Sequence, residues 1–551
     1  MLKRFCTVTI ITMLHINIFA FSGSDNPVRI YQMGDWVSYK NCNYVTSLTE
    51  SDEFIYFGTG GGIVPYQRYR KLWMEPYTVS DGLSDDFITA VYYDYSTGYL
   101  WASHRNGISF LNPVEESWEN TSDKFPDIHQ QSTIVRLGSV NTSVCAFVTS
   151  GQIREIDSHF GNYLGYIEEN QTGEIIWEPS GLDPVPSVVN FSINPPYLID
   201  GRGIVVDPYF REYKVNLFYK DNRLDIYGGI RDLGILTGDY NVKILNVQSF
   251  GPLQNYISAM CLDDDELFAG SFGKNDTPKR KGISVLNLNS GKWTYFENPF
   301  IPELASANVN DIYKDDAGRV WVATDLGLSV YNNKTNRWKR YSVHQGLNDE
   351  NISTIAIDDT LAWIGTPIGL NKIFIPTMKI KRVYLSHDKR FMKIYKIAVS
   401  RNCVWVGTDN GLYSIDKLTH NVEHYDMNGK TVDIDAAIMN NVKGIAVSDS
   451  LVVFSQYDGL LTFNHINNNF KRIPQYIDSH VLDMDMNRKY LWLGTDNGAY
   501  LIRLRDYYTE QYRLQDGLAG LRVNRVRIGP DFVWFGTDRG ITKYNWRKYA
   551  Y

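Results

Sequence analysis

The chain has 551 residues, 43% of them hydrophobic, which is more than one ordinary domain needs for its core. Its formal net charge of −7 at pH 7 excludes a general attraction to nucleic acid or anionic lipid. Cys42, Cys145, Cys261 and Cys403 lack the paired spacings of a disulfide framework, so we expect buried thiols. Two packed bodies without a nucleic-acid partner are expected.

Residues 1–22 have the pattern of a secretory signal peptide. Lys3 and Arg4 precede an apolar stretch over 5–21, and small residues occupy the end of the segment. An uncleaved membrane anchor is the alternative. No second segment of about 20 apolar residues follows, so the mature chain is expected to have no transmembrane segment.

A phrase related to Val-Trp-Val-Gly-Thr-Asp-Asn-Gly-Leu at 404–412 recurs along the chain at a period of roughly 40 residues. Such repetition is typical of an array in which no unit buries its apolar face alone. Twelve copies begin at Tyr56, Leu100, Ala146, Leu198, Ile226, Leu267, Val320, Ala362, Val404, Val452, Leu491 and Val533.

Residues 310–341 show one unit in full. Four short runs rich in β-branched and aromatic residues are separated by turns of Gly, Asn and Asp. Helical repeats of similar period need longer amphipathic patterns, and almost none occur after residue 25. The sequence therefore predicts an all-β fold, a β-propeller with about 12 four-stranded blades.

The two ends of the chain complement each other. The last unit stops after its third strand, whereas residues 35–39 match the fourth-strand pattern of 292–296 and 337–341 without three strands before them. We expect the N-terminal strand to complete the C-terminal blade, because this pairs an otherwise open edge.

A Pro-rich stretch at 179–208 follows the third unit and suggests a crossing between two propellers. The favoured division has a composite propeller formed by 23–180 and 426–551, with a second propeller inserted at 181–425. Two consecutive rings are the alternative.

The phrase Trp-(Val or Ile)-Gly-Thr-x-x-Gly-Leu, together with an Asp-Gly-Leu element, resembles the two-component regulator propeller repeat. The element occurs as Asp81-Gly82-Leu83 and Asp516-Gly517-Leu518, with Gln345-Gly346-Leu347 as a variant. The resemblance implies a bacterial periplasmic, secreted or cell-envelope protein that recognises a carbohydrate or another ligand. No kinase is expected in the sequence up to Tyr551, so the signalling role of such sensors is not carried over.

The opening pattern over 34–59 and 81–85 is also similar to the propeller part of a type IX secretion component. That component has an additional C-terminal domain that we do not find in this sequence. The resemblance leaves an envelope role open.

Polar residues in the crossovers between units form the candidate binding site, because they are expected on one face of a propeller. They are Asp85, Asp86, Asn348, Asp349, Glu350, Asn351 and Asn524. Their oxygens and amides suit sugar hydroxyls or a cation. The alternative is that these residues serve turn geometry, which we favour both for this crossover set and for the Asp and Asn residues of the Thr-Asp-x-Gly turns.

Other polar motifs are not expected to form sites. His420 and His424 lie about 13 Å apart along a turn and strand, so zinc binding is not expected. The runs 263–266 and 279–281 are interpreted as solvated turns. We predict no catalytic residue, metal or cofactor.

The sequence thus favours an exported, non-catalytic binding or scaffold protein with a protein or glycan partner. An envelope complex or a homodimer stays open as its assembly. The alternatives are a propeller-type polysaccharide lyase or hydrolase and an accessory component of type IX-like secretion. A perturbed carboxyl facing a deep pocket, with a second carboxylate nearby, would favour the enzyme.

Overall fold

The computed structural model describes residues 31–121, 133–167, 175–178, 188–273, 280–386, 391–425, 441–448, 451–456, 459–464, 469–474 and 477–549. The chain divides into Met1–Gln32 and Met33–Tyr551, and every sheet lies in the second part. The expected signal peptide lies outside the described residues. In these ranges the helices are single 3-10 turns, and none is long and apolar enough to cross a membrane.

Twelve sheets occur in the described residues: nine have four strands, two have five and one has three. Neighbouring strands are antiparallel except for one pair, so the all-β propeller fold is confirmed. The expected four-stranded unit at Leu198 is absent; that residue begins a two-residue strand of the three-stranded sheet. The reason is that the strands at 198–213 are too short to span a blade.

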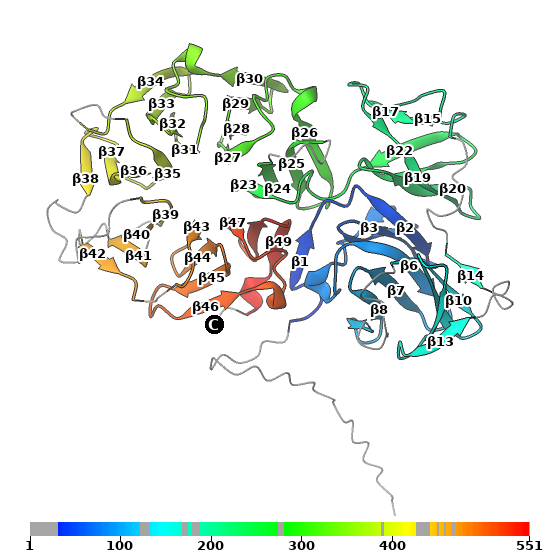
Figure 1. The fold of residues 1–551 in the computed structure, drawn as a ribbon. Coiled ribbons are helices and arrows are strands. Elements are labelled where there is room, and N and C mark those ends of the chain that lie inside the picture. The colour runs from blue at the N-terminus through cyan, green and yellow to red at the C-terminus, as the bar shows by residue number, and fades with distance from the viewer. Residues whose placement is uncertain are drawn as a thin grey trace, which may run out of the picture. The chain divides into compact units, whose positions relative to one another are not determined.

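Seven sheets form what we call the large ring, in which the first strands contact one another in a closed cycle from β23 to β47 and back to β23 (Figure 1). Their strands are β23 (Ile257–Leu262), β24 (Glu266–Ser271), β25 (Gly282–Asn287), β26 (Trp293–Glu297), β27 (Val309–Lys314), β28 (Arg319–Thr324), β29 (Gly327–Asn332), β30 (Arg337–Tyr341), β31 (Thr354–Asp358), β32 (Leu361–Thr366), β33 (Gly369–Phe374), β34 (Lys379–Val383), β35 (Ile394–Val399), β36 (Cys403–Thr408), β37 (Gly411–Asp416), β38 (Val422–Tyr425), β39 (Ile445–Val447), β40 (Leu451–Gln456), β41 (Gly459–Asn464), β42 (Asn469–Arg472), β43 (Val481–Met486), β44 (Tyr490–Thr495), β45 (Gly498–Arg503), β46 (Thr509–Tyr512), β47 (Val523–Ile528), β48 (Val533–Thr537), β49 (Ile541–Tyr544) and β1 (Trp36–Tyr39).

The other sheets form what we call the inserted group, because β1 precedes it and β23 follows it in the chain. Within it β2 contacts β6, β6 contacts β10, and β19 and β20 contact β2. Its strands are β2 (Val45–Glu50), β3 (Phe54–Thr59), β4 (Gly62–Gln67), β5 (Leu72–Trp73), β6 (Ile88–Asp94), β7 (Tyr99–His104), β8 (Gly107–Asn112), β9 (Ser117–Asn120), β10 (Ile134–Val140), β11 (Ser143–Val148), β12 (Ile153–Asp157), β13 (Tyr163–Ile167), β14 (Ile176–Trp177), β15 (Ser192–Ile193), β16 (Leu198–Ile199), β17 (Val205–Val206), β18 (Glu212–Tyr213), β19 (Val215–Lys220), β20 (Asp225–Ile230), β21 (Gly234–Asp239) and β22 (Ile244–Gln248).

The N-terminal strand closes the C-terminal sheet, as the sequence predicts. β1 pairs antiparallel with β49, with Trp36 opposite Tyr544 and Tyr39 opposite Ile541. The Trp36 ring is buried and stacks on Tyr544 with centroids 3.9 Å apart. The pairing covers the edge of β49 and joins the two ends of the folded chain.

The division between the two bodies differs from the expected one at 180 and 425. Strands from 257–425 contact those from 441–544, whereas strands from 45–177 contact those from 188–248. The chain crosses at 40–44 and 249–256, where Cys42 N donates to Phe250 O at 3.1 Å. A side chain at Gly251, which has φ of +80°, would meet Lys40 O at 1.7 Å, so glycine permits this close crossing.

The cores lie between neighbouring sheets. The second strand of each typical unit, such as β36 with Val404 to Thr408 all buried, packs on both faces. Cys42 and Cys145 are buried and Cys261 and Cys403 half-buried, all four as free thiols. Burial raises the pKa of Cys42 to about 12, so this thiol stays protonated and unreactive at neutral pH.

Arg280 corrects the interpretation of 279–281 as a solvated turn. Its side chain is buried and donates through Nε and Nη2 to Glu297 Oε1 at 3.0 and 2.7 Å. Its Nη1 also donates to the carbonyl oxygen of Leu233, in the turn between β20 and β21. Arg280 therefore ties the sheet of β23–β26 to the inserted group, and a buried ion pair explains its position.

Candidate functional site

A cavity of about 800 Å³ opens where three sheets approach one another. Its walls come from β5 and the following crossover, the ends of β23 and β25, and the turn between β47 and β48. The first wall belongs to the inserted group and the others to the large ring. Because the segments are hundreds of residues apart, the cavity exists only in the folded chain.

Aromatic side chains line much of this cavity: Tyr39, Trp73, Tyr77, Phe250, Phe532 and Trp534. Tyr39 and Trp534 are buried and stacked with centroids 6.2 Å apart. Trp73 packs against Tyr66 and Phe250, which fixes its ring on the inserted side. The wall is therefore apolar, and the half-buried rings of Trp73, Tyr77 and Phe532 are the ones that a ligand can reach.

Glu75 lies at the centre of the polar contacts of the cavity. The Tyr39 hydroxyl donates to Glu75 Oε1 at 3.1 Å, and Lys543 Nζ contacts the same oxygen at 3.0 Å. Lys543 also lies 4.4 Å from the centroid of the Phe532 ring. The Glu75 side chain is 51% exposed, so its carboxylate is available to an incoming molecule.

Asp81 is the second carboxyl group on this wall. It belongs to the 3-10 turn η1 (Val79–Asp81), and its Oδ2 accepts from Thr78 N at 2.9 Å and Thr78 Oγ1 at 3.2 Å. Burial is the main cause that raises its pKa to about 7, and the charges of Glu75 and Asp86 add to the effect. Asp81 therefore exchanges a proton near neutral pH.

The Asp-Gly-Leu elements cap short 3-10 turns. Similar turns occur at η5 (Val343–Gln345) and η6 (Leu514–Asp516), each with a side chain that accepts from its own N-cap backbone. The following glycines have positive φ and the leucines are buried. The motif is thus structural, and Asp81 differs because it also lines the cavity.

The large-ring wall adds amides and further acids. Asn287 ends β25, Asn289 and Ser290 come from the turn after it, and Asp263 and Asp264 come from the turn after β23. Asp263 is paired with Lys314 at 2.5 Å, which lowers its pKa. Glu75 is paired with Lys543 and Asp263 with Lys314, which leaves Asp81 and Asp264, among the described residues, as the lining acids without a Lys partner and gives the cavity a small excess of negative charge.

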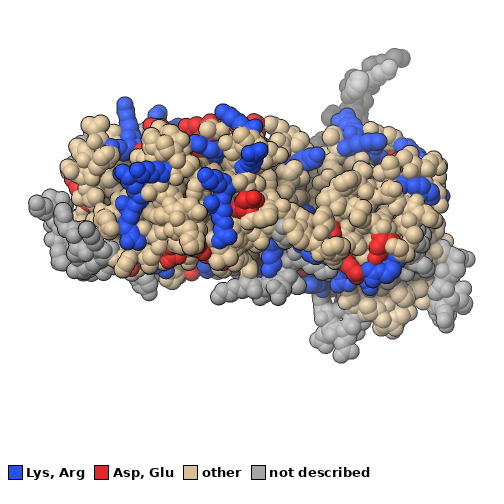
Figure 2. Space-filling model, turned by 90° about the horizontal axis from the view of Figure 1, so that it is seen from above, with Lys and Arg blue, Asp and Glu red and all other residues tan. Residues whose placement is uncertain are grey.

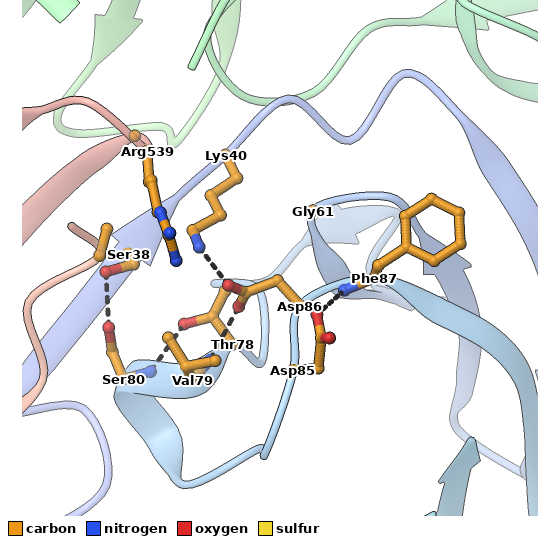
Figure 3. A network of polar contacts seen from close by, with 12 residues as sticks. Ser38, Lys40, Gly61, Thr78, Val79, Ser80, Asp85, Asp86, Phe87 and Arg539 are labelled. Atoms are coloured by element: carbon orange, nitrogen blue, oxygen red, sulfur yellow. Dashed lines mark hydrogen bonds and ion pairs between the residues drawn. The ribbon is translucent and has the colours of Figure 1, made fainter. Parts of the chain in front are cut away.

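Asp85 and Asp86, predicted as binding residues, lie in a polar network beside β1 (Figure 3). Asp86 forms an ion pair with Lys40 and accepts from Val79 N at 2.9 Å, with both charged side chains about one-tenth exposed. Asp85 accepts from Phe87 N at 2.9 Å. Asp86 thus holds the crossover between β5 and β6 against the segment after β1, whereas Asp85 stabilises a turn within the crossover.

Serine side chains extend the same network to the far end of the chain. Ser38 Oγ lies 2.5 Å from Ser80 Oγ and 3.0 Å from Thr542 Oγ1, and Ser80 Oγ donates to Gly517 O at 2.6 Å. Figure 3 shows Ser38 on β1 directed at Ser80. The network therefore joins η1, β1 and β49.

The other predicted binding residues lie elsewhere, in the large ring. Asn348 accepts from Arg382 Nε at 2.6 Å, and Asp349 accepts from Asn351 N at 2.8 Å. Asn524 is buried and donates to Ile257 O at 2.9 Å, and Glu350 is partly exposed. The structure does not bring these residues together with Asp85 and Asp86, and ligand binding by them stays a prediction.

Sequence reasoning missed the cavity residues, above all Trp73, Glu75 and Trp534. Trp73 follows the outer-strand pattern of other units, so nothing in its local sequence marks a ligand site.

His420 and His424 are the histidine pair whose spacing raises the question of a metal site. His424 Nε2 lies 2.7 Å from the carbonyl oxygen of Asn410. Within the described ranges, no cluster of three His, Cys, Asp or Glu residues could hold a metal ion.

Comparison with known proteins adds the following. Residues 303–325 match the family described as Two component regulator propeller. PorZ of Porphyromonas gingivalis, a surface component of the type IX secretion system, is 13% identical, with 93% of this chain and 87% of PorZ covered and a TM-score of 0.58.

The extracellular domain assigned to a hybrid two-component system of B. thetaiotaomicron is 15% identical, with 91% of this chain and 70% of that chain covered and a TM-score of 0.44. No curated protein matches the sequence. The chain thus carries the two-component regulator propeller repeat and has the β-propeller fold that is also found in PorZ.

Proposed function

We propose that the protein is an exported, non-catalytic binding protein and that its ligand, a glycan, occupies the cavity between the inserted group and the large ring. The observation that carries the proposal is the combination of aromatic walls with carboxylates and amides around about 800 Å³. Flat aromatic rings suit the apolar faces of sugars, and the oxygens and amides suit their hydroxyls. PorZ is a surface component, which supports export.

The charge of the cavity narrows the ligand class. Lys543 is paired with Glu75 and Lys314 with Asp263, so Asp264 and the titrating Asp81 carry the excess negative charge of the cavity. Like charges repel more strongly in a partly enclosed site than in open water. We therefore expect uncharged or amino-bearing glycans to bind and glycans rich in uronic acids to be rejected.

The test is binding of the purified protein to a glycan array, followed by calorimetry on any hit. Trp73→Ala should weaken binding roughly 10- to 100-fold, because contact with an aromatic face contributes about 1.5–3 kcal/mol. Trp338→Ala, on outer strand β30 and outside the cavity, is the matched control and should bind normally. Equal affinity of Trp73→Ala and the unmodified protein would overturn the site.

A second candidate, a polysaccharide lyase or hydrolase, is favoured by Asp81. A carboxyl group with a pKa of about 7, with a second carboxylate on the same cavity wall, suits proton transfer near neutral pH. Asp81→Asn keeps an oxygen that can accept from Thr78 N. Product formation that this change abolishes would establish the enzyme, whereas binding without turnover would support the binding protein.

A further inference from the structure

Lys and Arg side chains gather in two rows on the outer face of the large ring, over β30 and β34 (Figure 2). We call this surface the basic face, and it consists of Arg337, Lys339, Arg340, Lys379, Lys381 and Arg382. Lys334 and Lys372 adjoin the rows. The sequence contains no Asp or Glu between Asp325 and Asp349, nor between Asp359 and Asp388.

The six side chains are exposed and keep their charge available. Arg340 Nη2 donates to Leu326 O at 2.8 Å and Arg382 Nε to Asn348 Oδ1 at 2.6 Å, so their partners are neutral. In the part of the chain that the structure describes, none of the six forms an ion pair. The basic face is therefore not neutralised by the protein itself.

Protection of a sheet edge is the simplest explanation for charges on an outer strand. Such protection works with charge of either sign, and outer strands β9, β38 and β46 carry Glu instead. β30 and β34 are the outer strands of adjacent sheets, each with three cations and no acid. Edge protection alone does not account for this concentration of one sign.

A like-charge pair at the border of the basic face also favours an anionic partner. Lys372 of β33 lies directly opposite Lys381 of β34 in the sheet register. Like charges at opposed positions destabilise a sheet. Their presence is explained if an external anionic partner stabilises both charges.

We propose that the basic face docks on an anionic phospholipid bilayer. Two rows of cations across an outer face suit an extended, flat surface better than a small ligand. Phe374 and Tyr384, at the two ends of the β34 pairing, are 44% and 47% exposed. Exposed aromatic rings beside Lys and Arg are typical of surfaces that lie in the bilayer interface.

The attraction between the basic face and an anionic bilayer is local, so it does not conflict with the protein's formal net charge of −7. Each Lys or Arg close to an anionic membrane contributes about 1 kcal/mol, which is roughly a fivefold factor in affinity. Distant acids are screened beyond about 8 Å at physiological ionic strength. Six cations on one face can therefore outweigh acids located elsewhere on the molecule.

The experiment is co-sedimentation of the full chain with vesicles of phosphatidylcholine alone or mixed with 30% phosphatidylglycerol. The test variant carries Arg337→Gln, Lys339→Gln, Lys379→Gln and Lys381→Gln. The matched control removes four exposed cations elsewhere, by Lys214→Gln, Lys292→Gln, Lys489→Gln and Arg505→Gln. Thermal unfolding of both variants checks that they are folded.

We expect the unmodified protein and the control to bind the anionic vesicles, with binding reduced at high salt. The test variant should bind at least about 100-fold more weakly, since four cations are lost. Equal binding by the test variant, or equal loss in the control, would overturn the proposal. Binding to soluble polyglutamate but not to the vesicles would instead identify an acidic macromolecule as the partner.

Discussion

Replacement of Trp36 by alanine is expected to open the large ring at its closing strand. Trp36 is 1% exposed, stacks on Tyr544 and lies near Tyr512 and Phe535. An added Cβ at Gly517 would lie 2.5 Å from its Cγ, so the ring packs directly on that backbone. Removal of such a side chain lowers the free energy of unfolding by about 3–5 kcal/mol, because the surrounding sheets cannot collapse into the void that the indole leaves.

The assay combines urea unfolding with hydrogen exchange of the β49 amides. Trp36→Ala should lower the free energy of unfolding by that amount and speed exchange in Ile541–Tyr544. Trp363→Ala, at a buried site of the sheet of β31–β34, is the control. It should destabilise the protein without specific exchange in β49. A loss below about 1 kcal/mol, or unchanged exchange in β49, would refute closure by β1.

Three further predictions concern the same region. Asp86→Ala should cost about 3–5 kcal/mol in urea unfolding, because Lys40 stays buried without its partner, and a much smaller cost would show that water already reaches this pair. A disulfide is expected to form in Ser38→Cys/Thr542→Cys, since the two hydroxyl oxygens are 3.0 Å apart; the oxidised form should melt at a higher temperature than the reduced form. Asp81 should make the protein less stable as the pH rises from about 4 to about 7, because the folded state holds the proton more tightly than the unfolded chain. Asp81→Asn should remove this slope, and a slope that persists would assign the titration to another group.

The sequence could predict the repeat and its closure because both are local patterns. Trp36 and Tyr39 repeat the outer-strand pattern, so their missing partners could be inferred without coordinates. The crossing point could not be inferred from composition. The Pro-rich stretch after 179 is the strongest interruption of the repeat pattern. The two segments that connect the inserted group to the large ring nevertheless cross at Gly251, where the close approach of two backbones has no signature in the repeat.

The role of the Thr-Asp-x-Gly turns was predicted only in part. The threonine, not the aspartate, caps the turn: Thr324 Oγ1 donates to Gly327 O at 2.7 Å. The aspartate binds the preceding crossover, as Asp325 does when it accepts from Asn308 Nδ2 at 2.8 Å. Thr and Asp both suit turns. Which of them caps the turn and which binds the crossover depends on the neighbouring segment, and sequence spacing does not reveal that segment.

The candidate cavity and the basic face became visible only in three dimensions, for the same physical reason. Trp73, Asp263 and Trp534 lie hundreds of residues apart, and the two basic rows are interleaved with hydrophobic strand residues along the chain. The radial stacking of sheets brings equivalent positions of successive units side by side. Small biases within each unit therefore add up to a surface with one sign of charge.

The opposite charges of the cavity and the basic face imply two separate ligands. An anionic molecule that binds Arg337 and Lys381 would be repelled by Asp81 and Asp264 in the cavity. A neutral glycan gains little from the basic rows but fits the aromatic walls. Glycan affinity should therefore be nearly independent of salt while vesicle binding falls with salt, since only the second depends on long-range charge. The same salt series on the two ligands would separate the sites without any mutation.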